Sequence, residues 1–161
     1  MASWNEVEAA APELAARVRV AMDAHKHKVL ATLRRDGSPR ASGIEATFSD
    51  GELWLGMMPG SRKALDLRRD PRLALHSASE DPTEEDPSAW PGDAKVAGRA
   101  VEVDDPALLE RLGAGEGGGG GAHLFRVDLT EVVHTRVGTP ADHLVIEVWR
   151  EDSGLRRLRR A

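Results

Sequence analysis

Residues 53–75 read LWLGMMPGSRKALDLRRDPRLAL, and three local patterns follow one another in this stretch. A short apolar run comes first and is typical of a buried strand. Ser61–Arg69 then has helical spacing, and Asp70-Pro71 ends this segment because the residue before a proline disfavours helix. Arg72 begins a second apolar run. The stretch therefore predicts a strand, a short helix and another strand in direct succession.

The start of the predicted helix carries an unusual charge for its position. Ser61 suits the N-cap, since its side-chain oxygen can accept hydrogen bonds from the free amides of the first turn. Arg62 and Lys63 then occupy the first two helical positions, where the positive end of the helix dipole disfavours cations. A bound anion, most naturally a phosphate, would remove the conflict because amides, guanidinium and ammonium would all converge on it. The alternative is that both side chains extend into solvent.

Outward from this stretch the sequence predicts mostly strands. Upstream, Lys28–Arg34, Arg40–Phe48 and Glu52–Met58 form a meander, because Asp36-Gly37 and Asp50-Gly51 are hairpin-type dipeptides. The other predicted elements are helices at Pro12–Lys26 and Pro106–Leu112 and strands at Arg72–Ala78, Asp93–Val103, His123–Val137, Leu144–Arg150 and Leu155–Arg160. Between the last helix and the next strand, Gly113–Gly121 is rich in glycine and is predicted to be a flexible loop.

This order of elements predicts a mainly β fold with helical decoration. Six or more antiparallel strands at short spacing, with two or three peripheral helices, indicate a barrel or a sandwich. Residues 1–161 are expected to form a single domain, since the length suits one domain.

The composition excludes several classes of function. With 22 basic and 27 acidic residues, a net charge of -5 and 4% aromatic residues, the chain is poorly suited to nucleic-acid binding through phosphate contacts and base stacking. It has no cysteine, which excludes disulfides, thiolate zinc sites and a cysteine nucleophile. No stretch approaches the roughly 20 apolar residues of a membrane-spanning helix, and the N-terminus has no signal-peptide pattern. We expect a soluble, cytoplasmic protein.

Residues 53–75 resemble the flavin-binding segment of the pyridoxamine phosphate oxidase-like family, through a Gly-Ser-Arg-Lys-Ala core followed by Arg-Arg-Asp-Pro. Leu30–Phe48 and Lys95–Val103 resemble the same family in the same order. The resemblance implies a split β-barrel that binds FMN, or a related deazaflavin coenzyme, at the interface of a homodimer. It implies an oxidoreductase acting on a small molecule, with the redox chemistry carried by the cofactor ring. The alternative is a protein that binds flavin or haem without turnover.

The resemblance also assigns roles to individual residues. Arg62 and Lys63 would hold the cofactor phosphate, with Ser61 beside them. Two neighbouring strands would lie along the isoalloxazine ring, through Ser42, Gly43, Ile44, Glu45, Gly56 and Met57. Members of the family usually have Thr or Ser where Met57 stands, so this chain lacks one hydroxyl there. No catalytic residue is predicted, because no acid–base constellation is visible.

The C-terminus departs from the true pyridoxamine phosphate oxidases. Those enzymes recognise substrate with an Arg-Leu-His-x-Arg stretch, whereas residues 148–161 of this chain contain no histidine. The resemblance therefore indicates the class of cofactor and does not predict oxidation of vitamin B6 phosphates. The basic tail of Arg156, Arg157, Arg159 and Arg160 is interpreted as a solvated edge or an inter-subunit strip of ion pairs.

Three further features have two interpretations each. His25 and His27 lack the i, i+4 spacing of a helical metal-binding pair and no third ligand follows, so we interpret them as solvated and predict no metal site. Glu45 faces away from Ile44, either toward solvent or a subunit interface, or toward the flavin ring. Trp90 is expected to anchor the acidic loop that contains it, with a lid as the alternative.

Overall fold

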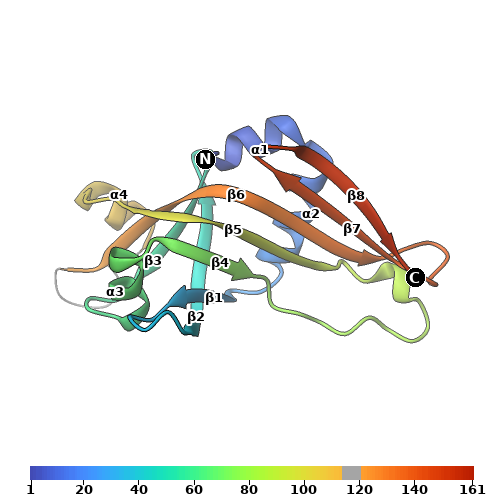
Figure 1. Ribbon diagram of the computed structural model, residues 1–161, viewed down its shortest axis with the longest axis horizontal. Coiled ribbons are helices and arrows are strands. Elements are labelled where there is room, and N and C mark those ends of the chain that lie inside the picture. Colours follow the sequence, from blue (N-terminus) through green and yellow to red (C-terminus); the bar gives the residue numbers. More distant parts are fainter. Residues whose placement is uncertain (114–120) are drawn as a thin grey trace.

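The computed structural model describes residues 1–113 and 121–161. Within these ranges it contains eight strands and four α-helices (Figure 1), so the fold is mainly β and every strand predicted from the sequence is confirmed. The strands are β1 (His27–Leu33), β2 (Pro39–Ser49), β3 (Glu52–Met57), β4 (Arg72–His76), β5 (Asp93–Glu102), β6 (His123–Val137), β7 (Leu144–Arg150) and β8 (Gly154–Arg160). The helices are α1 (Trp4–Ala10), α2 (Pro12–Asp23), α3 (Arg62–Arg69) and α4 (Pro106–Arg111). Most of the predicted flexible loop Gly113–Gly121 lies outside the described residues.

Six of the strands close into an antiparallel barrel. The sheet order is β3-β2-β1-β4-β5-β6-β7-β8, and a second pairing between β3 and β6 joins the ends of the first six strands. β6 is long enough for two partners on one edge, because its N-terminal end pairs with β3 and its C-terminal half pairs with β7. β7 and β8 therefore extend beyond the barrel as a hairpin, drawn in red in Figure 1. This arrangement fits the predicted split barrel.

The two predicted Asp-Gly turns set the register of the first hairpins. Asp50 and Gly51 have φ angles of 53° and 73°, both in the left-handed region that a type I′ turn between β2 and β3 requires. Gly37, in the turn between β1 and β2, has a φ of 83°. The resulting register places Gly43 opposite Val29 and Glu45 opposite His27. One face of β2 is thereby directed into the barrel and the other outward.

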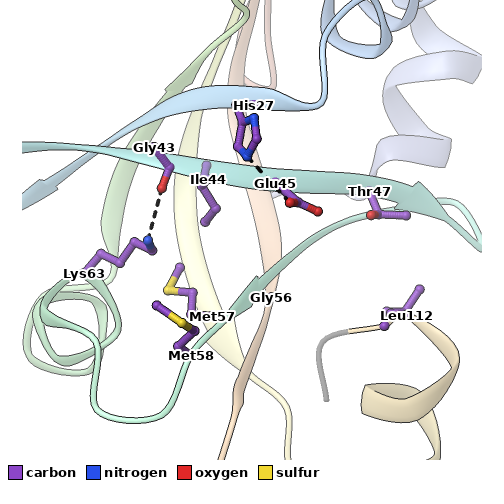
Figure 2. A pocket seen from close by; sticks show the side chains of 11 residues that line it. His27, Gly43, Ile44, Glu45, Thr47, Gly56, Met57, Met58, Lys63 and Leu112 are labelled. Atoms are coloured by element: carbon purple, nitrogen blue, oxygen red, sulfur yellow. Dashed lines mark hydrogen bonds and ion pairs between the residues drawn. The ribbon is translucent and has the colours of Figure 1, made fainter. Parts of the chain in front are cut away.

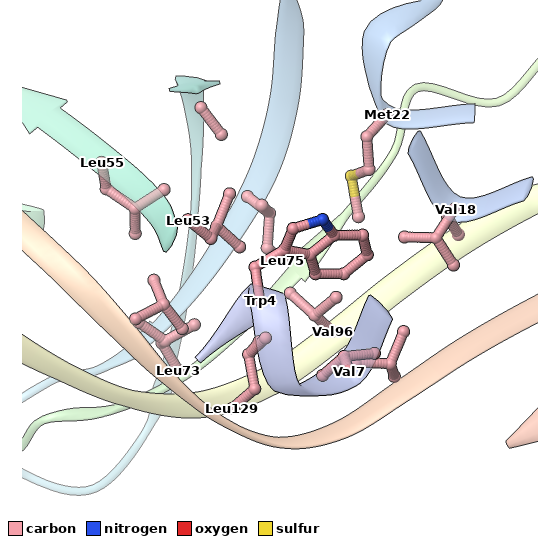
Figure 3. Packing of buried hydrophobic residues seen from close by; sticks show 14 of the residues in the cluster. Trp4, Val7, Val18, Met22, Leu53, Leu55, Leu73, Leu75, Val96 and Leu129 are labelled. Carbon is pink, nitrogen blue, oxygen red and sulfur yellow. The ribbon is translucent and has the colours of Figure 1, made fainter. Parts of the chain in front are cut away.

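The N-terminal helices cover the barrel core. Trp4 on α1 is only 1% exposed and packs on Phe48 of β2, with ring centroids 4.5 Å apart. Figure 3 shows Trp4 among Leu75 of β4, Val96 of β5 and Val18 of α2. The apolar faces of both helices and of the barrel strands therefore form one continuous core.

The sequence analysis did not predict α1. Its first turn is a capping box, since the Glu6 amide donates to the Ser3 hydroxyl and the Glu6 carboxylate accepts from the Ser3 amide. Helical periodicity misses so short a segment, whereas the Ser-x-x-Glu spacing would have indicated it. None of the described helices is long and apolar enough to cross a lipid bilayer.

A buried carboxylate fixes α3 against the barrel. Asp66 accepts hydrogen bonds from the Thr32 hydroxyl at 2.9 Å, from Arg40 Nε at 2.6 Å and from Arg69 Nη2 at 3.0 Å. Burial acts to raise the pKa of the Asp66 carboxyl, but these hydrogen bonds together outweigh it and hold this pKa below its ordinary value. Charge-assisted bonds therefore tie α3 to both β1 and β2.

The acidic loop between β4 and β5 is fastened at its end to β6 and the turn that follows. The Ser88 hydroxyl donates to the Gly138 carbonyl at 2.9 Å, and the His134 ring lies 2.8 Å from the Pro91 carbonyl. Trp90, between these two contacts, is half-buried. The loop is therefore held on both sides of Trp90, whose role as an anchor stays a prediction.

Candidate functional site

A groove of about 380 Å³ lies between the outer face of β2, the end of β3 and the start of α3 (Figure 2). Its lining consists of His27, Gly43, Ile44, Glu45, Thr47, Gly56, Met57, Met58, Lys63, Leu112 and Gly113. The predicted site residues among them are Gly43, Ile44, Glu45, Gly56, Met57 and Lys63. The structure therefore brings together both predicted strand segments and one of the two predicted cations.

Strand alternation on β2 builds one wall of this groove. Gly43, Glu45 and Thr47 are exposed on the outer face, while Ile44 between them is buried. The Glu45 carboxylate lies 3.2 Å from Lys26 Nζ and 3.7 Å from His27 Nε2. The prediction that Glu45 faces away from Ile44 is confirmed, and its side chain lies on the groove wall.

Lys63 connects the start of α3 to this wall. Its Nζ donates a hydrogen bond to the Gly43 carbonyl at 3.0 Å, drawn as a dashed line between Lys63 and Gly43 in Figure 2. An ammonium has three donors, so two remain for a ligand in the groove. One cation is therefore held at a fixed place where α3 begins.

Arg62 faces a different part of the surface. It lines a second hollow of about 570 Å³ with Arg35, Arg40, Leu65, Asp66, Arg68 and Arg69. Consecutive residues of a helix point about 100° apart, so Arg62 and Lys63 diverge although they are neighbours in the sequence. The two cations that the sequence groups together are thus directed into two hollows.

Two predicted site residues, Ser42 and Ser61, do not line the groove. Ser42 is half-buried on the inner face of β2, since its neighbour Gly43 takes the outer face. Ser61 is the N-cap residue of α3, as predicted, but its hydroxyl bonds no first-turn amide. Its oxygen is buried and has no hydrogen-bond partner among the described residues. The expected side-chain cap is therefore wrong.

Sequence reasoning missed several groove residues. The period of two along β2 could have placed Thr47 beside Gly43 and Glu45. His27, Leu112 and Gly113 come from other elements, and only the folded register brings them to the same place. Among the described residues, no group of three His, Cys, Asp or Glu side chains is arranged to hold a metal ion.

The chain matches the family described as Pyridoxamine 5′-phosphate oxidase over residues 14–136. This range begins in α2 and ends near the end of β6, so it includes the strands and the helix that form the groove. No curated protein shows a significant match to the chain.

Several solved structures share this fold. General Stress Protein 26 from Bacillus anthracis is 16% identical, with a TM-score of 0.55 over 89% of this chain and 97% of its own. PhzG from Burkholderia lata, in complex with tetrahydrophenazine-1-carboxylic acid, is 14% identical, with a TM-score of 0.59 over 89% of this chain and 84% of its own. HutZ, the haem storage protein from Vibrio cholerae, is 16% identical, with a TM-score of 0.53 over 74% of this chain and 89% of its own. At such identities the similarity shows a shared fold.

Proposed function

The chain belongs to the pyridoxamine 5′-phosphate oxidase family, and from this membership we propose that it binds FMN in the β2–β3–α3 groove and acts as an oxidoreductase on a small molecule. Family membership supports the cofactor class. The donors at the start of α3 support a phosphorylated cofactor in particular. The bare backbone on the groove wall supports a flat ring.

The hydroxyl of Ser61 carries this proposal. A buried hydroxyl without a hydrogen bond is costly, and Ser61 is in that state at the start of α3. The first amides of α3 also lack a side-chain cap. A phosphate there would accept from these amides and from Lys63 Nζ, in the manner of anions at helix N-termini, and from Ser61 once rotation of its side chain turns the hydroxyl outward. The residues present therefore fit a phosphate ester.

The remaining groove residues suit the binding of a flat ring. A Cβ added to Gly43 would meet no atom within 4 Å, so the wall there is open backbone that a ring can approach. Met57 and Met58 add polarisable apolar surface opposite it. Glu45 and His27 lie on the same groove, with Glu45 Oε1 3.7 Å from His27 Nε2, so a polar edge of the ring would meet both an acceptor carboxylate and an imidazole. The flavin itself, when bound, supplies electron and hydride transfer.

We also propose that two copies of the chain associate over the outer face of β1, β2 and β4. Ala31 pairs with Ala41 and with Ala74, and Val29 pairs with Gly43, so these side chains share one face. Val29 is 49% exposed. These small and apolar side chains, with His76 beside Val29, continue through Gly43 into the groove wall, and a second copy packed on them would cover the groove. A twofold pair is the commonest closed arrangement.

Two other ligands are the alternatives to FMN. A deazaflavin coenzyme would use the same phosphate donors. Met57 stands where the family usually has Thr or Ser, so the ring loses one hydroxyl contact, and this loss leaves both FMN and a deazaflavin as candidates. Haem held without turnover is the other, because HutZ has this fold and is a haem storage protein.

Vitamin B6 phosphates are not expected as substrates, since the C-terminal strand β8 contains no histidine. We place the reaction in the cytoplasm, consistent with a chain that has no cysteine.

The absorbance spectrum of the purified protein separates these ligands. FMN has bands at about 375 and 450 nm, a deazaflavin has one at about 420 nm, and haem has a Soret band. We expect the flavin spectrum, with FMN identified by mass after release. A Soret band, or an apo-protein that retains no added FMN after gel filtration, would contradict the proposal.

Substitution of Lys63 tests the phosphate site. Lys63→Ala is expected to weaken FMN binding by about 1.5–3 kcal/mol, roughly 10- to 150-fold, the range for a hydrogen bond to a charged group. Arg62→Ala is the matched control and should cost less, because Arg62 lines the second hollow. Titration of both apo-variants with FMN measures the difference. Equal losses would show that both cations reach the phosphate, and no loss in Lys63→Ala would remove the phosphate site.

Substitution of Gly43 tests the position of the ring. Since no atom of the chain lies near an added Cβ, Gly43→Val should change the free energy of unfolding by less than about 0.5 kcal/mol. It should weaken FMN and riboflavin alike, by about tenfold or more, through steric overlap with the ring. Melting of the apo-variant and titration with both ligands check this. Undiminished riboflavin binding would place the ring elsewhere.

A further inference from the structure

The loop that precedes α3 is held by a buried histidine. Gly60 has a φ of 64°, and its N–H donates to Nε2 of His123 at 3.1 Å. His123 is the first residue of β6, opposite Met57 in the register, and is 5% exposed. Its ring lies stacked near Phe125, with centroids 6.2 Å apart. Because a backbone amide can only donate, this contact requires an unprotonated Nε2.

The other ring nitrogen of His123 continues the chain of contacts. Nδ1 lies 2.9 Å from Glu102 Oε1, so the neutral ring carries its proton on Nδ1 and donates it to the carboxylate. Glu102 in turn accepts two hydrogen bonds at 2.7 Å from the Arg68 guanidinium. The hydrogen bond from Arg68 is the largest cause of a lowered pKa for Glu102, which keeps this group an acceptor.

The two ends of α3 are therefore held by one hydrogen-bonded pair of side chains, His123 at the start of the helix and Glu102 at its end. Gly60 lies just before the N-cap and bonds His123, while Arg68 lies in the last turn and bonds Glu102. The side chain of Lys63 then reaches Gly43 from a helix whose start cannot shift independently of β6.

We propose that His123, with its tautomer fixed by Glu102, is a positioning residue for phosphate recognition. By holding the Gly60 amide it sets where α3 begins, and so where Ser61 and Lys63 meet the phosphate. This inference rests on the proposed function, since it names what orients the same site. His123 itself does not touch the groove.

Two substitutions separate the two contacts of the ring. In His123→Asn the amide nitrogen occupies about the place of Nδ1 and keeps the bond to Glu102, but nothing reaches Gly60. In His123→Gln the terminal oxygen reaches about the place of Nε2 and can accept from Gly60, while the bond to Glu102 is lost. A purely structural role would lower the melting temperature of both and would not distinguish FMN from riboflavin.

The readout is the ratio of FMN affinity to riboflavin affinity in the full-length protein. We expect His123→Asn to lower FMN affinity about three- to tenfold, the loss of one hydrogen bond, with riboflavin affinity unchanged within about twofold. His123→Gln should keep the wild-type ratio within about the same twofold limit. An unchanged ratio in His123→Asn, or equal losses in both variants, would overturn the inference alone. A wild-type protein that binds both ligands equally would overturn the proposed function, and this inference with it.

A measurement without ligand checks the geometry independently. Long-range nitrogen–proton correlation spectra of the apo-protein should show His123 protonated on Nδ1, with slow hydrogen exchange of the Gly60 amide. A ring protonated on Nε2, or a rapidly exchanging Gly60 amide, would overturn the inference even if both variants fail to fold.

Discussion

Asp66 and Glu147 are both buried carboxylates between two arginines, but their surroundings differ. Asp66, beneath α3, has hydrogen bonds to both of its oxygens. Glu147, on β7 and 1% exposed, accepts at Oε1 from Arg157 at 2.7 Å, whereas Oε2 lies 3.3 Å from Arg17 Nη1 and has no hydrogen bond to a described residue. Both oxygens of Asp66 therefore accept hydrogen bonds, whereas only one oxygen of Glu147 accepts a hydrogen bond from a described residue.

The neighbourhood of Glu147 is incomplete in a second respect. His134 lies opposite Glu147 in the register, and its Nδ1 is also buried without a hydrogen-bond partner among the described residues. Burial lowers the pKa of His134, which favours the neutral ring. A fully satisfied polar network fixes geometry, whereas a partly satisfied one does so less well. The rigid network thus lies under the helix that presents Lys63, and the looser one lies in the β7–β8 extension.

The largest effect on stability is expected for Asp66→Asn. The amide leaves Arg40 and Arg69 without a counter-charge, and removing one partner of a buried ionic network costs about 3 kcal/mol. Urea denaturation should show a lower midpoint with an unchanged slope. A loss below about 1 kcal/mol would remove the contrast between the two carboxylates.

Acidification provides the control for this variant. The folded-state pKa of Asp66 is lowered, so its contribution is complete above the unfolded-state pKa of about 3.9 and is lost as the pH falls through the folded-state value. The difference in free energy of unfolding between wild type and Asp66→Asn should therefore be constant near neutral pH and shrink below about pH 4. A difference that does not depend on pH would mean that the charge of Asp66 is not what stabilises α3.

A smaller effect is expected for Glu147→Gln. The carbonyl oxygen of glutamine can still accept from Arg157, and Oε2 of Glu147 already lacks a hydrogen bond within the described part of the chain. We expect a loss of about 1 kcal/mol in the same urea experiment. A loss equal to that of Asp66→Asn would show that both carboxylates fix the fold to the same degree.

Local patterns in the sequence predicted most of the fold. The Asp-Gly dipeptides correctly predicted the hairpins of β1–β3, and Asp70-Pro71 correctly predicted the end of α3. Turns and helix ends can be predicted in this way because they depend on the backbone preferences of one or two residues. The closure of the barrel could not be predicted from such patterns. It depends on the pairing of Met57 with His123, residues far apart in the chain.

The parts of the candidate site that depend on local patterns were predicted, and the parts that depend on long-range packing were not. Gly43, Glu45 and Lys63 lie together as expected, since strand alternation and helix start are local features. The separation of Arg62 from Lys63 depends on which surface α3 packs against. The role of His123 depends on contacts to Gly60 from another strand, and no local pattern marks it.

Titration of the wild-type apo-protein with FMN and with riboflavin tests the central claim most directly. The two ligands share a ring and differ by the phosphate that Ser61, the first amides of α3 and Lys63 are proposed to bind. We predict that FMN binds at least about tenfold more tightly, since one charge-assisted hydrogen bond alone contributes about 1.5 kcal/mol or more. Equal affinities for FMN and riboflavin would contradict the claim that the start of α3 is a phosphate site.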